Sequence, residues 1–174
     1  MKYFVKIFVV TFLLLFCTHT FTEQKVAYLD MTFILNNSKA GEAAQIFLKK
    51  TFSDNQKKYS NLEKKLKKEE SDLLSKKEVI TKEEYTKRAE NLRNKVTKYK
   101  TDRRKSLDKI TKQRSSAREQ LLNKLDPILK DFAIKNNVSI IIDQKYIIQG
   151  ITELDVTNLI VAKLNKELPS LKLE

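Results

Sequence analysis

"SKKEVITKEEY", from Ser75 to Tyr85, decides the fold of this chain, because it separates two long segments with helical periodicity. Within it, Thr81 and Glu84 form a T-x-x-E capping box, a pattern that marks the start of a helix. No Gly or Pro interrupts residues 49–119. The stretch therefore predicts the turn of an antiparallel helical hairpin, with arms of about 35 residues or about 50 Å at 1.5 Å per residue.

Apolar side chains on both sides of this turn recur mostly at spacings of three and four, as they do along the a/d seam of a coiled coil. In the first segment they are Leu48, Phe52, Tyr59, Leu62, Leu66 and Leu73. In the second segment they are Tyr85, Ala89, Leu92, Val96, Tyr99, Ile110, Ala117, Leu121, Leu125, Ile128 and Phe132. Polar residues interrupt the seam at Gln56, Glu69, Arg103, Ser106 and Arg114. Because such a seam buries few side chains, we expect the outer hairpin to open locally at low cost.

The net positive charge of the chain comes entirely from this hairpin. Residues 49–118 hold 24 Lys or Arg and 11 Asp or Glu, and the rest of the chain holds 11 of each, so the whole formal charge of +13 comes from residues 49–118. Taken singly, most of these lysines would only solvate an exposed helix. Because self-repulsion costs stability, an excess of this size favours binding to a partner of opposite charge.

The two ends of the chain carry strand signals, because they contain short runs of β-branched and apolar residues. The predicted strands are residues 25–30 (KVAYLD), 138–143 (VSIIID) and 146–149 (YIIQ). Only Gln144 and Lys145 separate the last two, which predicts a tight β-hairpin. We therefore expect an α+β fold that is mostly α. A small β-rich body, residues 23–48 and 120–174, would carry an inserted coiled-coil arm, residues 49–119.

Four residues mark boundaries within this plan. Asp30 and Asp155 are predicted to cap a short helix and the last helix of the chain. Gly41 is predicted to mark the break before the arm. Pro127 is predicted to kink or restart the second long helix.

A three-stranded body of this size would leave sheet edges unpaired and strands apolar on both faces. Such surfaces are usually covered by another subunit. We predict a homo-oligomer closed by cyclic symmetry. The alternative is a monomer whose helices fold over the sheet.

Residues 1–22 are predicted to be a cleaved secretory signal peptide. Lys2 and Lys6 precede an apolar run of about ten residues, too short to span a bilayer, and small polar residues follow. An uncleaved membrane anchor is the alternative. We expect export from the cytoplasm.

Cleavage would remove Cys17 and His19, the only Cys and the only His of the chain. The mature protein would then have no thiol nucleophile, no imidazole base and no metal site built on Cys or His. Gly41 and Gly150 are the only glycines, so a Gly-rich phosphate loop is excluded. We predict no catalytic, metal-binding or cofactor-binding residues and no enzyme activity, although catalysis by carboxylates alone stays formally open.

Three stretches resemble the periplasmic chaperone Skp (OmpH-like) family in their order and lengths. They are "KVAYLDMTFILNNSKAGEAAQ" (residues 25–45), "VSIIIDQKYIIQG" (residues 138–150) and "DVTNLIVAKLN" (residues 155–165), with the Lys-rich helical pair between the first two. The resemblance implies a homotrimer in which three helical tentacles surround a cavity. It implies a periplasmic holdase that binds unfolded outer-membrane proteins without ATP and prevents their aggregation before membrane insertion. It also places Val26, Tyr28, Ile140, Ile142 and Ile148 in the trimer body.

The kind of partner follows from charge, location and the apolar pattern. Nucleic acid fits the charge but not an exported protein without a base-reading module. A membrane-surface helix would need a free apolar face, whereas here pairing of the two helices uses the apolar stripe. An unfolded, acidic polypeptide fits best. The residues expected to bind it, through diffuse contacts, are Lys57, Lys58, Lys64, Lys65, Lys68, Arg88, Arg93, Lys100, Arg103, Arg104 and Lys105. An envelope coiled-coil spacer, a polyanion-binding (lipopolysaccharide) protein, and contact with anionic lipid stay open as alternatives.

Overall fold

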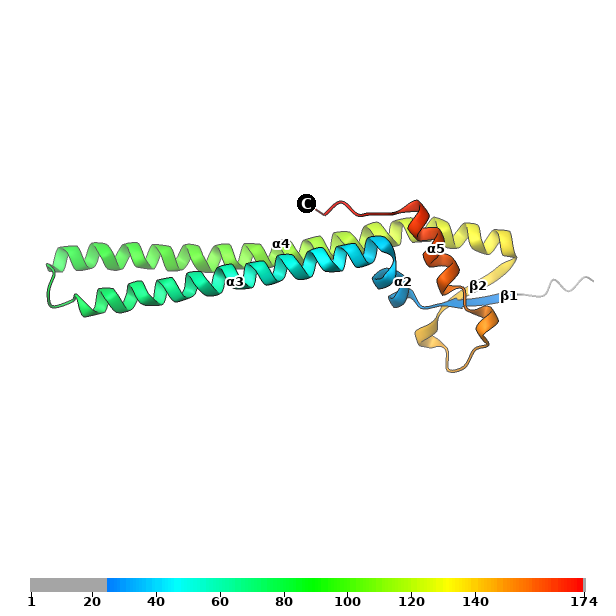
Figure 1. The fold of residues 1–174 in the computed structure, drawn as a ribbon, viewed down its shortest axis with the longest axis horizontal. Coiled ribbons are helices and arrows are strands. Elements are labelled where there is room, and N and C mark those ends of the chain that lie inside the picture. The colour runs from blue at the N-terminus through cyan, green and yellow to red at the C-terminus, as the bar shows by residue number, and fades with distance from the viewer. Residues whose placement is uncertain (1–24, 174) are drawn as a thin grey trace, which may run out of the picture.

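The structure, a computed structural model, describes residues 25–173 and consists of a small body from which a long helical hairpin projects (Figure 1). The mostly helical α+β fold predicted from the sequence is confirmed. The predicted signal peptide, with Cys17 and His19, lies outside the described residues. Within residues 25–173, no helix combines the length and the apolar character that a membrane span requires.

The hairpin consists of α3 (Lys39–Ser75) and α4 (Lys82–Asn136), joined by the predicted turn. Thr81 caps α4, because its side-chain oxygen accepts a hydrogen bond of 3.2 Å from the backbone N–H of Glu84. The predicted seam is buried along most of its length, at Leu48, Tyr59, Leu66, Leu73, Tyr99, Ile110, Ala117, Leu121, Leu125, Ile128 and Phe132. With 55 residues, α4 is about 80 Å long at 1.5 Å per residue, longer than the predicted arm, because it continues into the body.

Two details of the predicted hairpin are corrected. Phe52 is 49% exposed and does not lie in the seam. Near it, the Ser106 hydroxyl donates a hydrogen bond of 2.8 Å to Asn55 Oδ1, so a polar contact joins the two helices at this level. Pro127 does not restart the second helix, because α4 continues through it as one helix. Leu125 and Ile128, on either side of Pro127, are buried in the body core and hold the helix in place.

The sheet of the described chain has two strands, β1 (Lys25–Leu29) and β2 (Val138–Asp143), which pair in parallel. The predicted hairpin between residues 138–143 and 146–149 is therefore wrong. A 3₁₀ turn, Gln144–Tyr146, follows β2, and the Asp143 carboxylate holds it by accepting a hydrogen bond from the backbone N–H of Lys145 and pairing with the Lys145 ammonium at 2.9 Å. Two-residue hairpin turns favour Gly, Asn or Asp, which adopt positive φ readily. Gln144 and Lys145 are not residues of this kind.

The body core contains residues from both ends of the described chain. One face of β1 contributes Ala27 and Leu29, and it packs against α2 (Met31–Asn37), the base of α4, and α5 (Thr157–Glu167). The other buried members of this core are Ile34, Ala40, Leu121, Leu125, Ile128, Phe132, Ile160 and Leu164. The arm is thus an insertion whose base is fixed by residues from both ends.

The predicted cap at Asp30 is confirmed, whereas the N-cap position of α5 is Val156 rather than the predicted Asp155. The Asp30 carboxylate accepts a hydrogen bond of 2.8 Å from the backbone N–H of Phe33 in α2. The Asp155 carboxylate accepts from the backbone N–H of Thr157, at 2.9 Å, in the first turn of α5. The break before the arm lies at Ser38, which ends α2 and caps α3, rather than at Gly41. Gly41 is needed for a different reason, because a Cβ there would come within 2.0 Å of the carbonyl oxygen of Leu35.

Candidate functional site on the helical arm

All eleven predicted cationic binding residues lie on α3 or α4 with exposed side chains. Only Arg88 among them forms an ion pair in the described chain, with Glu84 one turn earlier in α4. Lys58 lies over the ring of Tyr59, with its Nζ atom 5.4 Å from the ring centroid. The arm therefore presents many cationic groups that form no ion pair within the described chain.

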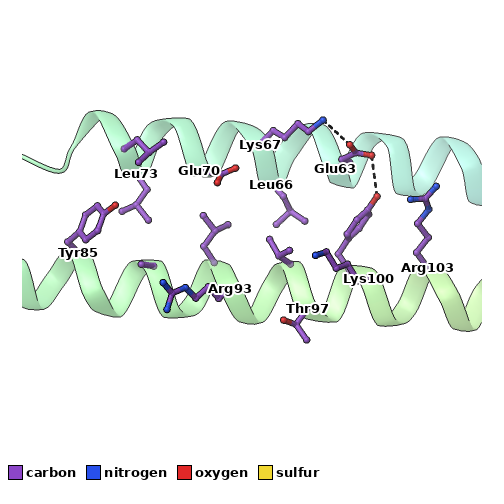
Figure 2. A pocket seen from close by; sticks show the side chains of 15 residues that line it. Glu63, Leu66, Lys67, Glu70, Leu73, Tyr85, Arg93, Thr97, Lys100 and Arg103 are labelled. Atoms are coloured by element: carbon purple, nitrogen blue, oxygen red, sulfur yellow. Dashed lines mark hydrogen bonds and ion pairs between the residues drawn. The ribbon is translucent and has the colours of Figure 1, made fainter.

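The two flanks of the arm differ. On one, which we call the groove flank, an open groove of about 780 Å³ runs between α3 and α4 toward the tip (Figure 2). Its walls carry Glu63, Lys67 and Glu70 from α3 and Arg93, Lys100 and Arg103 from α4. Its floor is apolar and includes Leu66, Leu73, Ala89, Leu92 and Val96. Figure 2 shows Leu66 and Tyr85 pointing into the space between the helices and Arg103 extending from α4 toward α3.

Glu63 is the centre of a polar network at the edge of this groove. It pairs with Lys67 at 2.9 Å and accepts a hydrogen bond of 3.3 Å from the hydroxyl of Tyr99. The hydrogen bond that Lys67 donates, and then the positive charge of Lys67, lower the pKa of the Glu63 carboxyl. Glu63 in turn raises the pKa of Lys67. Lys67 is therefore engaged, whereas Arg93, Lys100 and Arg103 have no ion pair in the described chain.

The opposite side of the hairpin, which we call the closed flank, is bridged by charge. Lys95 of α4 pairs with Glu69 of α3 at 2.7 Å, and Arg88 is engaged by Glu84. The hollow on this flank is only about 220 Å³ and is mostly polar, with Asp72 and Lys76 among its residues. On the closed flank, two of the cations are held in ion pairs, and little apolar surface is available to a partner.

The groove continues toward the body as a second hollow of about 300 Å³. It shares Tyr99, Lys100 and Arg103 with the first and adds Arg104 and Leu107. The structure thus brings together four of the predicted residues, Arg93, Lys100, Arg103 and Arg104. The others do not line this groove: Lys57, Lys58, Lys64, Lys65, Lys68, Arg88 and Lys105.

Part of this surface was not predicted from the sequence. Leu74 lines the groove and is 58% exposed, and Leu107 is 42% exposed. Both lie beside the seam rather than in it. A signal was available, because each is an apolar residue next to a seam position in an otherwise charged segment.

A second candidate surface lies on the body. Because strand side chains alternate, β1 turns Ala27 and Leu29 to the core and Val26 to the opposite face, where it pairs in register with Ile140. Val26 and Ile140 are exposed, and Ile148 is fully exposed. Ile142 is half-buried. Other exposed apolar residues of this region are Tyr146, Ile151 and Leu154.

Tyr28 differs from the other four residues predicted for the oligomer body, because it is buried within its own chain. Its hydroxyl donates a hydrogen bond of 3.2 Å to the carbonyl oxygen of Ile151. Its ring also packs so closely on Gly150 that a Cβ there would lie 2.8 Å from Tyr28 Cε1. Tyr28 thus fixes the loop that follows β2.

These features define a class of α+β protein in which a small body, with an exposed apolar sheet face, carries one long cationic coiled-coil arm. The chain belongs to the OmpH-like outer membrane protein family, whose model matches residues 25–164. The predicted resemblance to Skp and its OmpH-like relatives is confirmed.

A solved structure has the same fold. It is that of a candidate outer membrane chaperone (OmpH-like) from Caulobacter crescentus CB15, with a TM-score of 0.78 and 17% sequence identity. The match covers 90% of this chain and 93% of that one. None of the curated proteins compared with the chain matches it significantly.

Proposed function

We propose that this protein is an ATP-independent holding chaperone of the bacterial periplasm. It binds unfolded outer-membrane proteins, here called clients, between cationic arms and keeps them from aggregating before membrane insertion. Family membership and the chaperone assignment of the Caulobacter protein support this role. The observation that carries the proposal is the arm itself, on which ten of the eleven predicted cationic residues are exposed without an ion pair in the described chain. The role is binding, without catalysis and without a cofactor.

The mechanism is electrostatic capture by many weak contacts. An exposed ion pair contributes only about 0 to 1 kcal/mol, so no single lysine holds a client. A field of like charge along the arm nevertheless accelerates encounter with an acidic chain, and several contacts together raise avidity. Because each contact breaks easily, the client stays mobile and is released without ATP.

We infer that residues 23–48 and 120–174 form the trimer body and that residues 49–119 form the client-binding arm. The exposed side chains of Val26, Ile140 and Ile148 support this division, since large apolar groups gathered on one face favour burial against another copy. Three bodies joined by these faces would set three arms around one cavity. A cavity with cationic walls suits a client whose negative charges are spread along its length.

An aggregation assay with an arm deletion tests this function. An unfolded outer-membrane barrel protein is diluted from denaturant into the mature chain, or into the same chain without residues 50–118, and light scattering is followed. We expect the complete chain to suppress scattering. The deletion variant should have no effect on scattering, although it should keep the same number of subunits. If the complete chain binds lipopolysaccharide but does not suppress aggregation, the protein is a polyanion-binding protein instead.

A further inference from the structure

The difference between the two flanks of the arm indicates where a client lies. We propose that the groove flank binds one extended, strand-length segment of the client, in which apolar and acidic side chains alternate. This inference rests on the proposed function and assigns it to one face of each arm. The closed flank, where Lys95 bridges to Glu69, makes no direct contact with the client in this arrangement.

The floor of the groove is apolar and incompletely covered. Leu66 and Leu73 close the seam, but Leu92 and Val96 remain half-buried, and Leu74 stands exposed at the outer edge. Ala89 supplies only a methyl group, which leaves room where a larger side chain would fill the groove. Each apolar side chain that a client adds here removes surface from water on both partners, at about 25 cal/mol per Å².

The dimensions of the groove fit a short extended segment. Its α4 wall runs from Tyr85 to Arg103, about 27 Å at 1.5 Å per helical residue. An extended chain advances about 3.3 Å per residue, so about eight residues cover this length. A strand of a membrane β-barrel is about ten residues long, which makes one client strand the natural unit of binding.

The charges along the groove specify acidic side chains on the client. Arg93, Lys100 and Arg103 stand along the α4 wall without ion pairs in the described chain. On the α3 wall the cation Lys67 is already held by Glu63. A client carboxylate therefore finds its partners on α4, above all Arg93 and Lys100, because the charge of Arg103 also acts on Glu63 and lowers its pKa.

An extended client satisfies the floor and the α4 wall together. In a strand, successive side chains point to opposite sides, so one row of a barrel strand is apolar and the other polar. With the apolar row on Leu92 and Val96, the polar row turns outward, where its carboxylates can reach Arg93, Lys100 and Arg103. A client segment whose apolar residues form one contiguous run could not place apolar side chains on the floor and carboxylates on the α4 wall at the same time.

Two triple variants of equal charge test the assignment. The groove variant carries R93E, K100E and R103E, and the control carries K57E, K64E and K68E, three exposed residues of α3 that line neither part of the groove. The probe is a fluorescent peptide of alternating Val/Tyr and Asp/Glu, titrated into the full oligomer by fluorescence anisotropy. We expect the Kd of the peptide to rise by about tenfold or more in the groove variant and by less than about threefold in the control. Both variants lose the same positive charge and its long-range attraction, but only the groove variant loses direct contacts with the peptide.

An uncharged pair of variants provides an independent readout. A89F fills the floor of the groove, whereas N91F places the same ring on the closed flank. We expect A89F to weaken peptide binding and N91F to leave it unchanged, with the helical circular dichroism of both as in the wild type. A peptide of the same composition, with its apolar residues in one block, should bind more weakly than the alternating one.

The outcomes separate this inference from the proposed function. Equal losses in the two triple variants, or equal binding of the alternating and block peptides, would overturn the groove assignment. So would anionic lipid vesicles that bind through the groove while the peptide does not. Aggregation of an unfolded barrel protein is measured in parallel on the wild type. If the wild type suppresses it, the function stands whatever the peptides do, and if it does not, the proposed function fails as well.

Discussion

Tyr59 of α3 and Tyr99 of α4 pack edge to face across the hairpin, with ring centroids 6.0 Å apart and an angle of 63° between the rings. They are buried with Leu66 in a small apolar cluster of the arm, separate from the body core. Between the two clusters, Ser106 donates a hydrogen bond to Asn55, and Leu48, Ile110 and Ala117 are buried without belonging to either cluster. The outer arm therefore depends on its own small core, and the tyrosine pair is the centre of that core.

The first prediction concerns this pair. Tyr99→Ala should lower the free energy of opening of the outer arm by about 3 kcal/mol, because it removes a buried ring and leaves a cavity. Native-state hydrogen exchange measures this at the amides of residues 55–75 and 85–105. Tyr99→Phe is the matched control and should cost less than about 1 kcal/mol, since it loses only the hydrogen bond to Glu63. Equal loss of protection in the body and the arm would contradict a separate arm core.

The second prediction concerns pH and Glu63. Lys67 lowers the pKa of the Glu63 carboxyl below its ordinary value of 4.5. A carboxyl with a lowered folded pKa adds stability that is present above its unfolded pKa and is lost as pH falls through the folded value. Glu63→Gln should therefore lower the Tm slightly at neutral pH, and the difference from the wild type should vanish well below the ordinary value.

Circular dichroism melting curves across this pH range make the comparison. Glu70→Gln is the control, because Glu70 lies two turns further along α3 and has no ion pair in the described chain. It should show no pH-dependent difference from the wild type. A Glu63→Gln difference that persists unchanged into strong acid would mean that the ion pair with Lys67 does not stabilise the arm.

The third prediction concerns assembly. Ile148→Asp should convert the proposed oligomer into monomers with unchanged helical content, because Ile148 is fully exposed in the single chain and would be buried only between copies. Light-scattering mass in solution measures the change. Val79→Asp, at the exposed tip of the arm, makes the same substitution and should leave the mass unchanged. An Ile148→Asp protein of wild-type mass would exclude this residue from the interface.

The fourth prediction concerns salt. Between about 0.1 M and about 1 M ionic strength the Debye length falls from about 10 Å to about 3 Å, so the field of the arm is screened. The affinity for an acidic, unfolded client should fall by about tenfold or more over this range, as measured by anisotropy of a labelled barrel protein. Apolar contacts do not weaken with salt in this way. An unchanged affinity would assign client binding to the apolar floor alone.

The hairpin could be predicted because its signals are local. The capping box at Thr81 and Glu84 and the spacing of Tyr59, Leu66 and Tyr99 each specify a helix or its seam without reference to distant residues. The pairing of the strands could not be predicted in the same way, because it depends on residues far apart in the sequence. Residues 146–149 have the composition of a strand, but β2 instead pairs with β1, far away in sequence, and Asp143 turns the chain after β2 into a 3₁₀ helix.

The candidate site could be predicted only in part, for a related reason. Charge counting locates the cations on the arm, and every one of them is exposed. The periodicity of one helix identifies its buried stripe but not which flank is closed by a contact from the other helix. The flanks differ because Lys95 reaches Glu69 across the hairpin on one side, while Arg93 and Lys100 line the open side.

Neutralising the arm while keeping the assembly tests the central claim most directly. All eleven predicted cations, from Lys57 to Lys105, are changed to Gln, and the variant is first checked for wild-type helical content and light-scattering mass. Unfolded outer-membrane barrel protein is then diluted into wild type and variant at equal concentration, and scattering is followed. We predict that the wild type suppresses aggregation and that the variant loses most of this protection. Full protection by the neutral arm would contradict the claim that its positive charge captures clients.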